Sequence, residues 1–166
     1  DGGAAWDDDF EMLVQFEINK PEGGRRYKRP YVAVWIENAE GLPVRTLAVW
    51  YQAGKGQRWL PDLRRWHRDD MKRRETDKKD ILPTVSGATR APGKYKLQWD
   101  GKSDAGEFVT QGKYTVFIEA AREHGSYQLM KEEIEIATKP FSATLKDNIE
   151  IKGASLEYRT KPAGDK

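Results

Sequence analysis

Residues 31–37 read Tyr-Val-Ala-Val-Trp-Ile-Glu, and this stretch indicates a buried β-strand. Successive side chains of a strand point to opposite faces. The valines and the isoleucine therefore share one face, and the tyrosine, alanine and tryptophan share the other. Both faces are apolar, which is typical of a strand in the centre of a sheet that is covered on both sides.

Shorter patterns on either side of this stretch predict more strands. Residues 10–18 alternate apolar and polar side chains, and only Leu13 interrupts the polar face. Further strands are expected at residues 43–51, 94–99 and 113–121, and residues 127–137 and 141–158 together supply two or three more. Seven or eight short strands joined by turns predict an all-β protein, an antiparallel β-sandwich of the immunoglobulin or fibronectin III type.

The length of 166 residues fits one domain. We place that domain at residues 10–159, with an N-terminal tail at 1–9 and a C-terminal tail at 160–166. The chain opens with Asp-Gly-Gly and no methionine, which indicates either the end left by removal of an export signal or the start of a fragment.

A charged, partly helical insertion is expected at residues 54–80, because residues 64–79 are almost all charged. Asp62 is the expected N-cap of a helix there, and Leu63, Trp66 and Met71 form a thin apolar stripe. The remainder, residues 68–79, is expected to be an exposed helix or a disordered loop. Long insertions in compact domains are often functional.

Composition excludes several kinds of protein. There is no cysteine, so disulfides, zinc thiolates and a cysteine nucleophile are excluded. The chain holds 29 basic and 27 acidic residues, and a net charge of +2 argues against a dedicated nucleic-acid binder. No apolar run approaches the roughly 18–20 residues of a membrane span.

A basic cluster with interleaved aromatic side chains is the first candidate site. Its members are Arg58, Trp59, Arg64, Arg65, Trp66, His67 and Arg68. Arginine forks suit phosphate or carboxylate groups, and an indole stacks on a flat ring, so the cluster fits an FMN phosphate, a haem propionate or a siderophore carboxylate. It also fits nucleic acid. Alternatively, Trp59 and Trp66 close one end of the sandwich while the arginines pair with carboxylates.

The sequence gives little support for a metal site or for a set of catalytic residues. His124 is either a metal or cofactor ligand or the partner of a strand-end hydrogen bond. With only two histidines and no cysteine, a complete transition-metal site is hard to assemble, so no metal is expected. No nucleophile–histidine–acid triad and no glycine-rich phosphate loop is evident, so we do not expect an enzyme.

Two segments resemble the immunoglobulin-like domain of flagellar hook-capping proteins: residues 31–47, and residues 93–118 with their Trp-Asp-Gly, Asp-x-x-Gly and Gly-x-Tyr motifs. Three further segments, 58–66, 85–93 and 119–125, together resemble a bacterial periplasmic family known as domain of unknown function 2271. That resemblance runs from about Phe10 to Ile136. It implies export to the periplasm and an immunoglobulin-like sandwich. It also implies partnership with PepSY-type membrane proteins and flavin transferases in iron uptake or extracytosolic redox systems.

Ser86-Gly87-Ala88-Thr89 is similar to the site at which periplasmic flavin transferases attach FMN to a threonine hydroxyl. The resemblance makes Thr89 the acceptor and Arg90 a neighbour of the cofactor. Two positions depart from the pattern, because Pro83 stands where an aspartate is usual and Arg90 where a second hydroxyl often follows. Alternatively, residues 85–93 are a structural loop in which a hydroxyl caps backbone groups.

Two functional hypotheses follow. In the first, the chain is a periplasmic accessory protein of a flavin- or iron-linked redox or uptake system and carries FMN on Thr89 as an electron carrier, with the Arg/Trp cluster around the flavin. In the second, it is a non-catalytic binding or scaffold sandwich that holds no cofactor and docks a membrane partner.

Overall fold

The computed structural model describes residues 3–20, 28–52, 54–122 and 125–162. The strands are β1 (Phe10–Ile18), β2 (Tyr31–Asn38), β3 (Pro43–Trp50), β4 (Ser86–Gly87), β5 (Gly93–Trp99), β6 (Gly112–Ala121), β7 (Tyr127–Ile136), β8 (Phe141–Thr144) and β9 (Ile151–Thr160). The helices are η1 (Gly54–Asp62), a 3-10 helix, followed by α1 (Arg64–Asp77) and α2 (Leu82–Val85). Every strand except β4 lies where the sequence predicts one.

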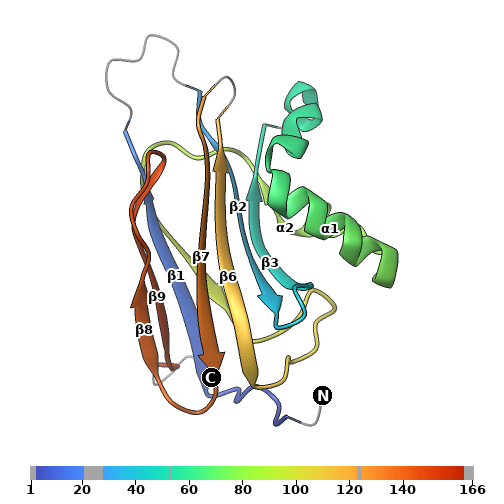
Figure 1. Cartoon of the computed structure of the whole chain (residues 1–166), viewed down its shortest axis with the longest axis vertical. Coiled ribbons are helices and arrows are strands. Elements are labelled where there is room, and N and C mark those ends of the chain that lie inside the picture. The colour runs from blue at the N-terminus through green and yellow to red at the C-terminus, as the bar shows by residue number, and fades with distance from the viewer. Residues whose placement is uncertain (1–2, 21–27, 53, 123–124, 163–166) are drawn as a thin grey trace.

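The strands form two facing sheets (Figure 1). One has the order β5-β1-β9-β8 and the other has the order β4-β3-β2-β6-β7. All pairings between these strands are antiparallel except that of β3 with β4, which is parallel. A mostly β protein with two sheets is therefore confirmed. Its assignment to the immunoglobulin or fibronectin III type stays a prediction.

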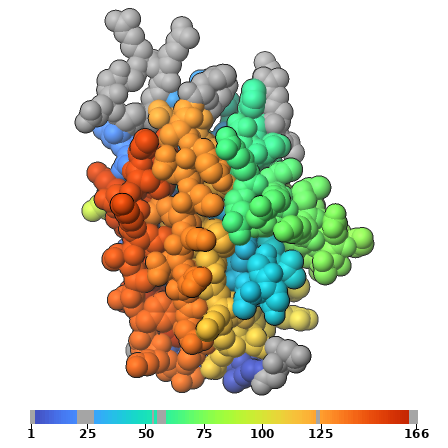
Figure 2. All heavy atoms as spheres, in the orientation of Figure 1, coloured from blue at the N-terminus to red at the C-terminus, as the bar shows by residue number. Residues whose placement is uncertain are grey.

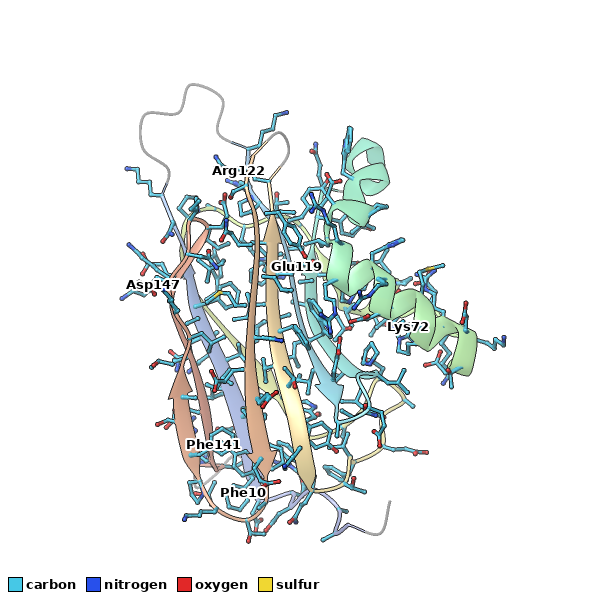
Figure 3. The ribbon with its side chains drawn as sticks, viewed as in Figure 1. Phe10, Lys72, Glu119, Arg122, Phe141 and Asp147 are labelled. Carbon is cyan, nitrogen blue, oxygen red and sulfur yellow. The ribbon has the colours of Figure 1, made fainter. Side chains whose placement is uncertain are left out.

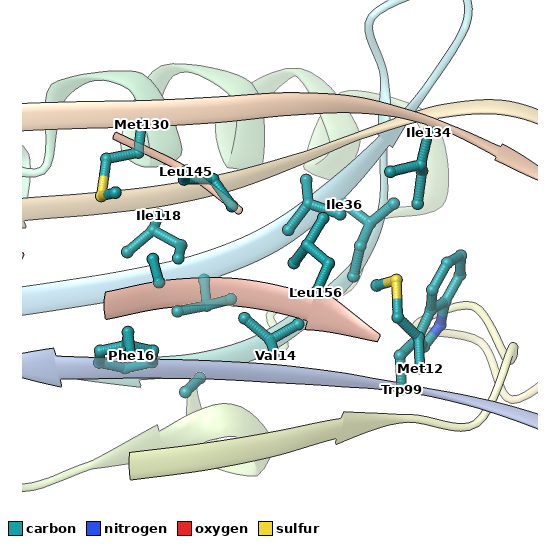
Figure 4. Close-up of a cluster of buried hydrophobic side chains, with 14 of the residues drawn as sticks. Met12, Val14, Phe16, Ile36, Trp99, Ile118, Met130, Ile134, Leu145 and Leu156 are labelled. Carbon is teal, nitrogen blue, oxygen red and sulfur yellow. The ribbon is translucent and has the colours of Figure 1, made fainter. Parts of the chain in front are cut away.

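The main core lies between the two sheets (Figure 4). Met12, Val14 and Phe16 of β1 belong to one buried cluster with Ile36 of β2 and Ile118 of β6. Full burial of a side chain of this size contributes about 1.5–3 kcal/mol. Alternate side chains of each strand point into this core, and their burial holds the two sheets together.

A second, smaller core lies on the outer face of the five-stranded sheet. Ala33 and Trp35 of β2 pack there with Leu63 and Trp66 from the helical segment. Strand β2 is consequently buried on both faces, as its two apolar faces predict. The same packing fixes the beginning of α1 against the sheet.

The stretch before β1 differs from the tail that we expected. Trp6 is buried and packs against Trp99 and Tyr158, with ring centroids 4.8 and 5.3 Å away. Its backbone N–H donates to the carbonyl of Val109 at 2.8 Å. Gly101 has φ +82°, and a Cβ there would lie 2.1 Å from the Trp6 ring, so only glycine fits. The core therefore includes a residue outside the predicted domain boundary.

The charged insertion is helical, but its details correct the sequence prediction. Asp62 ends η1 and is exposed, and the N-cap of α1 is Leu63, which makes no side-chain capping bond. Met71, expected in an apolar stripe, is 45% exposed. The helix instead buries Asp69, Asp70 and Arg73. Buried residues of this kind do not appear in an apolar stripe, because oppositely charged groups that pair can be buried together.

Candidate functional site

Helix α1 begins at a carboxylate supplied by the sheet. Glu119, on the outer face of β6, accepts hydrogen bonds from the backbone N–H groups of Arg65 at 2.7 Å and Trp66 at 2.9 Å. The hydroxyl of Tyr127 donates to the same carboxylate. Figure 3 shows Glu119 beside the first turn of α1. Burial raises the pKa of Glu119, while these three donors favour the ionised form and limit the rise.

Trp66 and Trp59, predicted to stack on a ligand, belong to the second core. Trp66 is 2% exposed, and its indole N–H donates to the hydroxyl of Thr46 at 3.2 Å. Trp59 is half-buried and packs at the margin of the same cluster. The buried Trp66 has no free face for a flat ligand, which corrects its assignment as a cofactor-binding residue. The side chain of Arg58 lies outside the described part of the chain.

Arg65 links two buried carboxylates. Its Nε donates to Asp69 at 2.7 Å, and its Nη2 lies 3.5 Å from Glu37. The indole N–H of Trp35 donates to the other oxygen of Glu37 at 2.8 Å. Burial, together with a hydrogen bond to Asp69, raises the pKa of Glu37 to about 7. Burial also opposes ionisation of Asp69, but bonds from Glu37, Arg65 and Arg68 outweigh it and lower its pKa.

Cations and aromatic rings stack in the same region. Trp35 and Phe117 lie parallel, with centroids 4.9 Å apart, and the Arg65 guanidinium lies 4.8 Å from the Phe117 centroid. Arg64 lies over Tyr127 at 4.6 Å. These contacts hold the arginines along the sheet. The predicted alternative, in which arginines pair with carboxylates and tryptophans pack inside, describes Arg65 and Trp66 well, although they cover a sheet face rather than one end.

An open groove of about 620 Å³ runs beside the start of α1 on the outer face of the five-stranded sheet. Glu37, Arg65 and Phe117 form its inner part. Exposed charged side chains of β6 and β7 border it, namely Lys113, Lys131, Glu133 and Glu135. Figure 2 shows β6 as a strip between β7 and the segments of the β2–β3 turn and α1. Within the described residues, neither of the two lysines forms an ion pair.

The segment Ser86–Arg90 lies elsewhere, at the edge of the five-stranded sheet. Ser86 and Gly87 form β4, and the carbonyl of Gly87 accepts from the N–H of Tyr51 at 2.9 Å. Ala88 is exposed, Thr89 is half-buried, and both lie in irregular backbone. The Arg90 guanidinium lies 4.7 Å from the Trp50 ring centroid.

In the described residues, no hydrogen bond, ion pair or ring contact joins the two predicted parts of a flavin site. Arg65 and Trp66 contact groups on β2, β3, β6 and α1, and Arg90 contacts Trp50 at the end of β3. His124, the remaining predicted ligand, lies outside the described residues. In the part of the chain that is described, no three His, Asp or Glu side chains converge on a metal site.

Comparison with known protein families shows which family the chain matches. Residues 11–153 match a family described as "Predicted periplasmic protein (DUF2271)". The chain belongs to the DUF2271 family. This confirms the resemblance that the sequence segments indicated and a periplasmic localisation; the likeness to hook-capping proteins stays a prediction. No curated protein and no solved structure matches this DUF2271 protein. Among its described residues, no helix is long and apolar enough to cross a membrane.

Four residues of the site in this DUF2271 protein were not predicted from the sequence: Glu37, Asp69, Glu119 and Phe117. Two of these positions carried a signal. Glu37 ends the strand with two apolar faces, and Glu119 lies in a strand beside Val116 and Ile118. An acidic residue in a strand that is covered on both sides needs a partner. Trp35 and Tyr127 are partners from the same or the next strand, but the donors on the distant helix follow from no local pattern.

Proposed function

We propose that this DUF2271 protein is a non-catalytic accessory protein of a periplasmic redox or uptake system, and that it docks a partner protein in the groove beside α1. The immunoglobulin-like type of its two sheets is part of the same proposal. The observation that supports docking is the groove itself. The beginning of α1 covers the outer face at β2, while Lys113 of β6 and Lys131 of β7 remain exposed.

The chemistry of the groove favours a polypeptide partner. Its rim carries lysines and glutamates that form no ion pairs with one another in the described structure. Its inner part presents Arg65, whose guanidinium covers the buried Phe117 ring. An extended segment with charges of both signs would complement such a surface. The periplasmic part of a PepSY-type membrane protein is the partner class that the family resemblance implies.

Site-specific photo-crosslinking tests this proposal. A photoreactive residue is placed at Thr115 or Glu135 in the groove, and at Gln15 or Lys96 on the outer face of the other sheet as a control. The protein is co-expressed with a PepSY-type membrane protein. We expect crosslinks from the groove positions alone, lost in Lys113→Glu/Lys131→Glu. Equal crosslinking from both faces, or none from the groove, would overturn the proposal.

FMN attachment at Thr89 is a second candidate function. It is supported by the position of the acceptor, which lies in irregular backbone next to exposed Ala88 at a sheet edge. In this step the Thr89 hydroxyl oxygen attacks the FMN phosphorus of FAD, AMP leaves, and the hydroxyl proton passes to a base of a periplasmic flavin transferase. Arg65 and Trp66 take no part, because they contact other groups.

Intact-protein mass spectrometry distinguishes the second candidate from the first. The chain is exported to the periplasm with a flavin transferase, alongside Thr89→Ala and Thr84→Ala. Thr84 is an exposed threonine in α2 and serves as a matched control. We expect the mass of FMN to be added to the wild type and to Thr84→Ala only. An unmodified wild type would contradict FMN attachment at Thr89. Partner docking without a cofactor would then remain as the proposed function.

A further inference from the structure

A second groove, of about 290 Å³, lies between η1, α1 and the start of α2. His67 and Met71 both line it. The two residues are four apart on α1, and residues at this spacing are neighbours on one helix face, about 5–6 Å apart at Cβ. This spacing brings an imidazole and a thioether together at one site.

Both side chains are free to bind. In the described part of the chain, the imidazole of His67 has no hydrogen-bond or ion-pair partner, and it is half-buried. Met71 is 45% exposed, whereas Met12 and Met130 are buried in the main core. The groove therefore holds an imidazole nitrogen and a thioether sulfur that make no hydrogen bond or ion pair in the described structure.

The charges around the pair disfavour hard cations. Asp70 and Asp80 line the same groove, but arginines hold both carboxylates: Arg74 Nη2 lies 2.6 Å from Asp80, and Arg74 Nε lies 3.1 Å from Asp70. Ca²⁺ and Mg²⁺ need several free oxygen ligands. What remains at the site is one nitrogen and one sulfur, a ligand set that suits soft monovalent copper.

We propose that His67 and Met71 form a binding site for Cu(I). The ion is held by an imidazole nitrogen and the Met71 Sδ at the wall of the groove. Arg73 and Arg74 pair with Asp70, and Arg74 pairs with Asp80, so the ion is held by the nitrogen and the sulfur rather than by an excess of negative charge. The proposal is independent of partner docking and of FMN attachment.

Competition for Cu(I) tests the site. The untagged full chain is titrated anaerobically with Cu(I) against bathocuproine disulfonate. The variants are His67→Ala, Met71→Leu and, as a matched control, Lys72→Ala at an exposed residue of α1 that does not line the groove. We expect one Cu(I) per chain, an affinity at least about tenfold weaker in each of the first two variants, and an unchanged affinity in the control. Circular dichroism confirms that each variant is folded.

A second measurement separates the sulfur ligand from a histidine that binds copper alone. Ag(I), which does not change oxidation state, is added while the methionine methyl groups are followed by NMR. We expect the Met71 methyl signal to shift and those of Met12 and Met130 to stay. Unchanged Cu(I) affinity in His67→Ala or Met71→Leu, lost affinity in Lys72→Ala, or no shift of Met71 would each overturn the proposal.

Discussion

Glu119 is fully buried in a strand, and its carboxylate lies at the N-terminus of a helix more than fifty residues earlier in the chain. The first N–H groups of a helix have no partner within the helix. The N-cap Leu63 supplies no side-chain oxygen, so Glu119 takes that role from the sheet. One side chain thus joins helix, sheet and Tyr127.

Replacement of Glu119 should destabilise the whole domain. Glu119→Ala leaves two helix N–H groups and the Tyr127 hydroxyl without their acceptor, so we expect the free energy of unfolding to fall by about 1–3 kcal/mol. Urea denaturation measures the change. Glu133→Ala, an exposed glutamate on the neighbouring strand, should alter stability by less than about 0.5 kcal/mol. Equal effects of the two variants would contradict a capping role for Glu119.

Trp66 provides the second test at the scale of single residues. Its replacement affects stability strongly if Trp66 is a core residue and weakly if it only stacks on a ligand. As a buried core residue, Trp66→Ala should lower the free energy of unfolding by about 3–5 kcal/mol. Half-buried Trp59 should lose clearly less in Trp59→Ala. Chemical denaturation of both variants checks the order. A Trp66→Ala variant as stable as the wild type would show that Trp66 is not a core residue and would support a role in ligand binding.

At the scale of elements, α1 is joined to the sheet by buried charged groups as well as apolar contacts. Asp69 on the helix and Glu37 on β2 meet at Arg65. Further along the helix, Arg73 is 7% exposed and bonds to Asp70 and Asp77 within α1, while its Nε lies 3.9 Å from Asp104 in the connection between β5 and β6. The attachment of this helix should therefore depend on pH.

Glu37 determines whether the stability of the protein rises or falls with pH. Its pKa is raised from 4.5 to about 7 in the folded protein, so the native state holds a proton that the unfolded chain releases. The stability contributed by this proton is complete below about pH 4.5 and is lost as the pH rises to about 7. At 1.36 kcal/mol per pKa unit, the loss amounts to about 3 kcal/mol.

Glu37→Gln separates this effect from other titrations, because the amide keeps the shape and does not ionise. Between about pH 5 and about pH 8 we expect the wild type to lose more stability than the variant, measured by urea denaturation at both values. Some loss remains in the variant, since the pKa values of Glu119 and Asp104 are also raised by burial. An identical pH dependence in both proteins would show that Glu37 is ionised throughout.

At the scale of the whole molecule, aromatic rings from distant segments close the core at one end. Trp6, Trp99 and Tyr158 come from the stretch before β1, from β5 and from β9. Phe10 and Phe141 both stack on Tyr158, at 4.7 and 5.3 Å. This cluster ties the segment before β1 to the four-stranded sheet.

Trp6→Ala should consequently act as a core substitution although it lies outside the predicted domain. We expect a loss of about 3–5 kcal/mol in the free energy of unfolding, because a large buried ring leaves a cavity. Thermal and urea denaturation measure it. Phe108→Ala, at a ring that is 40% exposed, is the matched control and should be close to neutral. A stable Trp6→Ala would restore the prediction of a free tail.

The sequence by itself determined the strands and their faces. Alternation in residues 10–18 and the two apolar faces of residues 31–37 are local properties, and a period of two defines a strand wherever it occurs. The sequence also placed the helical insertion and identified the family segments. It indicated Arg65 and Trp66 as notable, although it could not assign one to an ion-pair network and the other to a core.

Only the tertiary structure decided which charged groups meet. Glu119 and the start of α1 are 53 and 54 residues apart, and Glu37 meets Arg65 across 28 residues. Nothing in a local pattern specifies such a partner, because the pairing follows from how the helix crosses the sheet. The same holds for Trp6 and for both grooves: burial depends on neighbours brought together by folding, and these neighbours lie far apart in the chain.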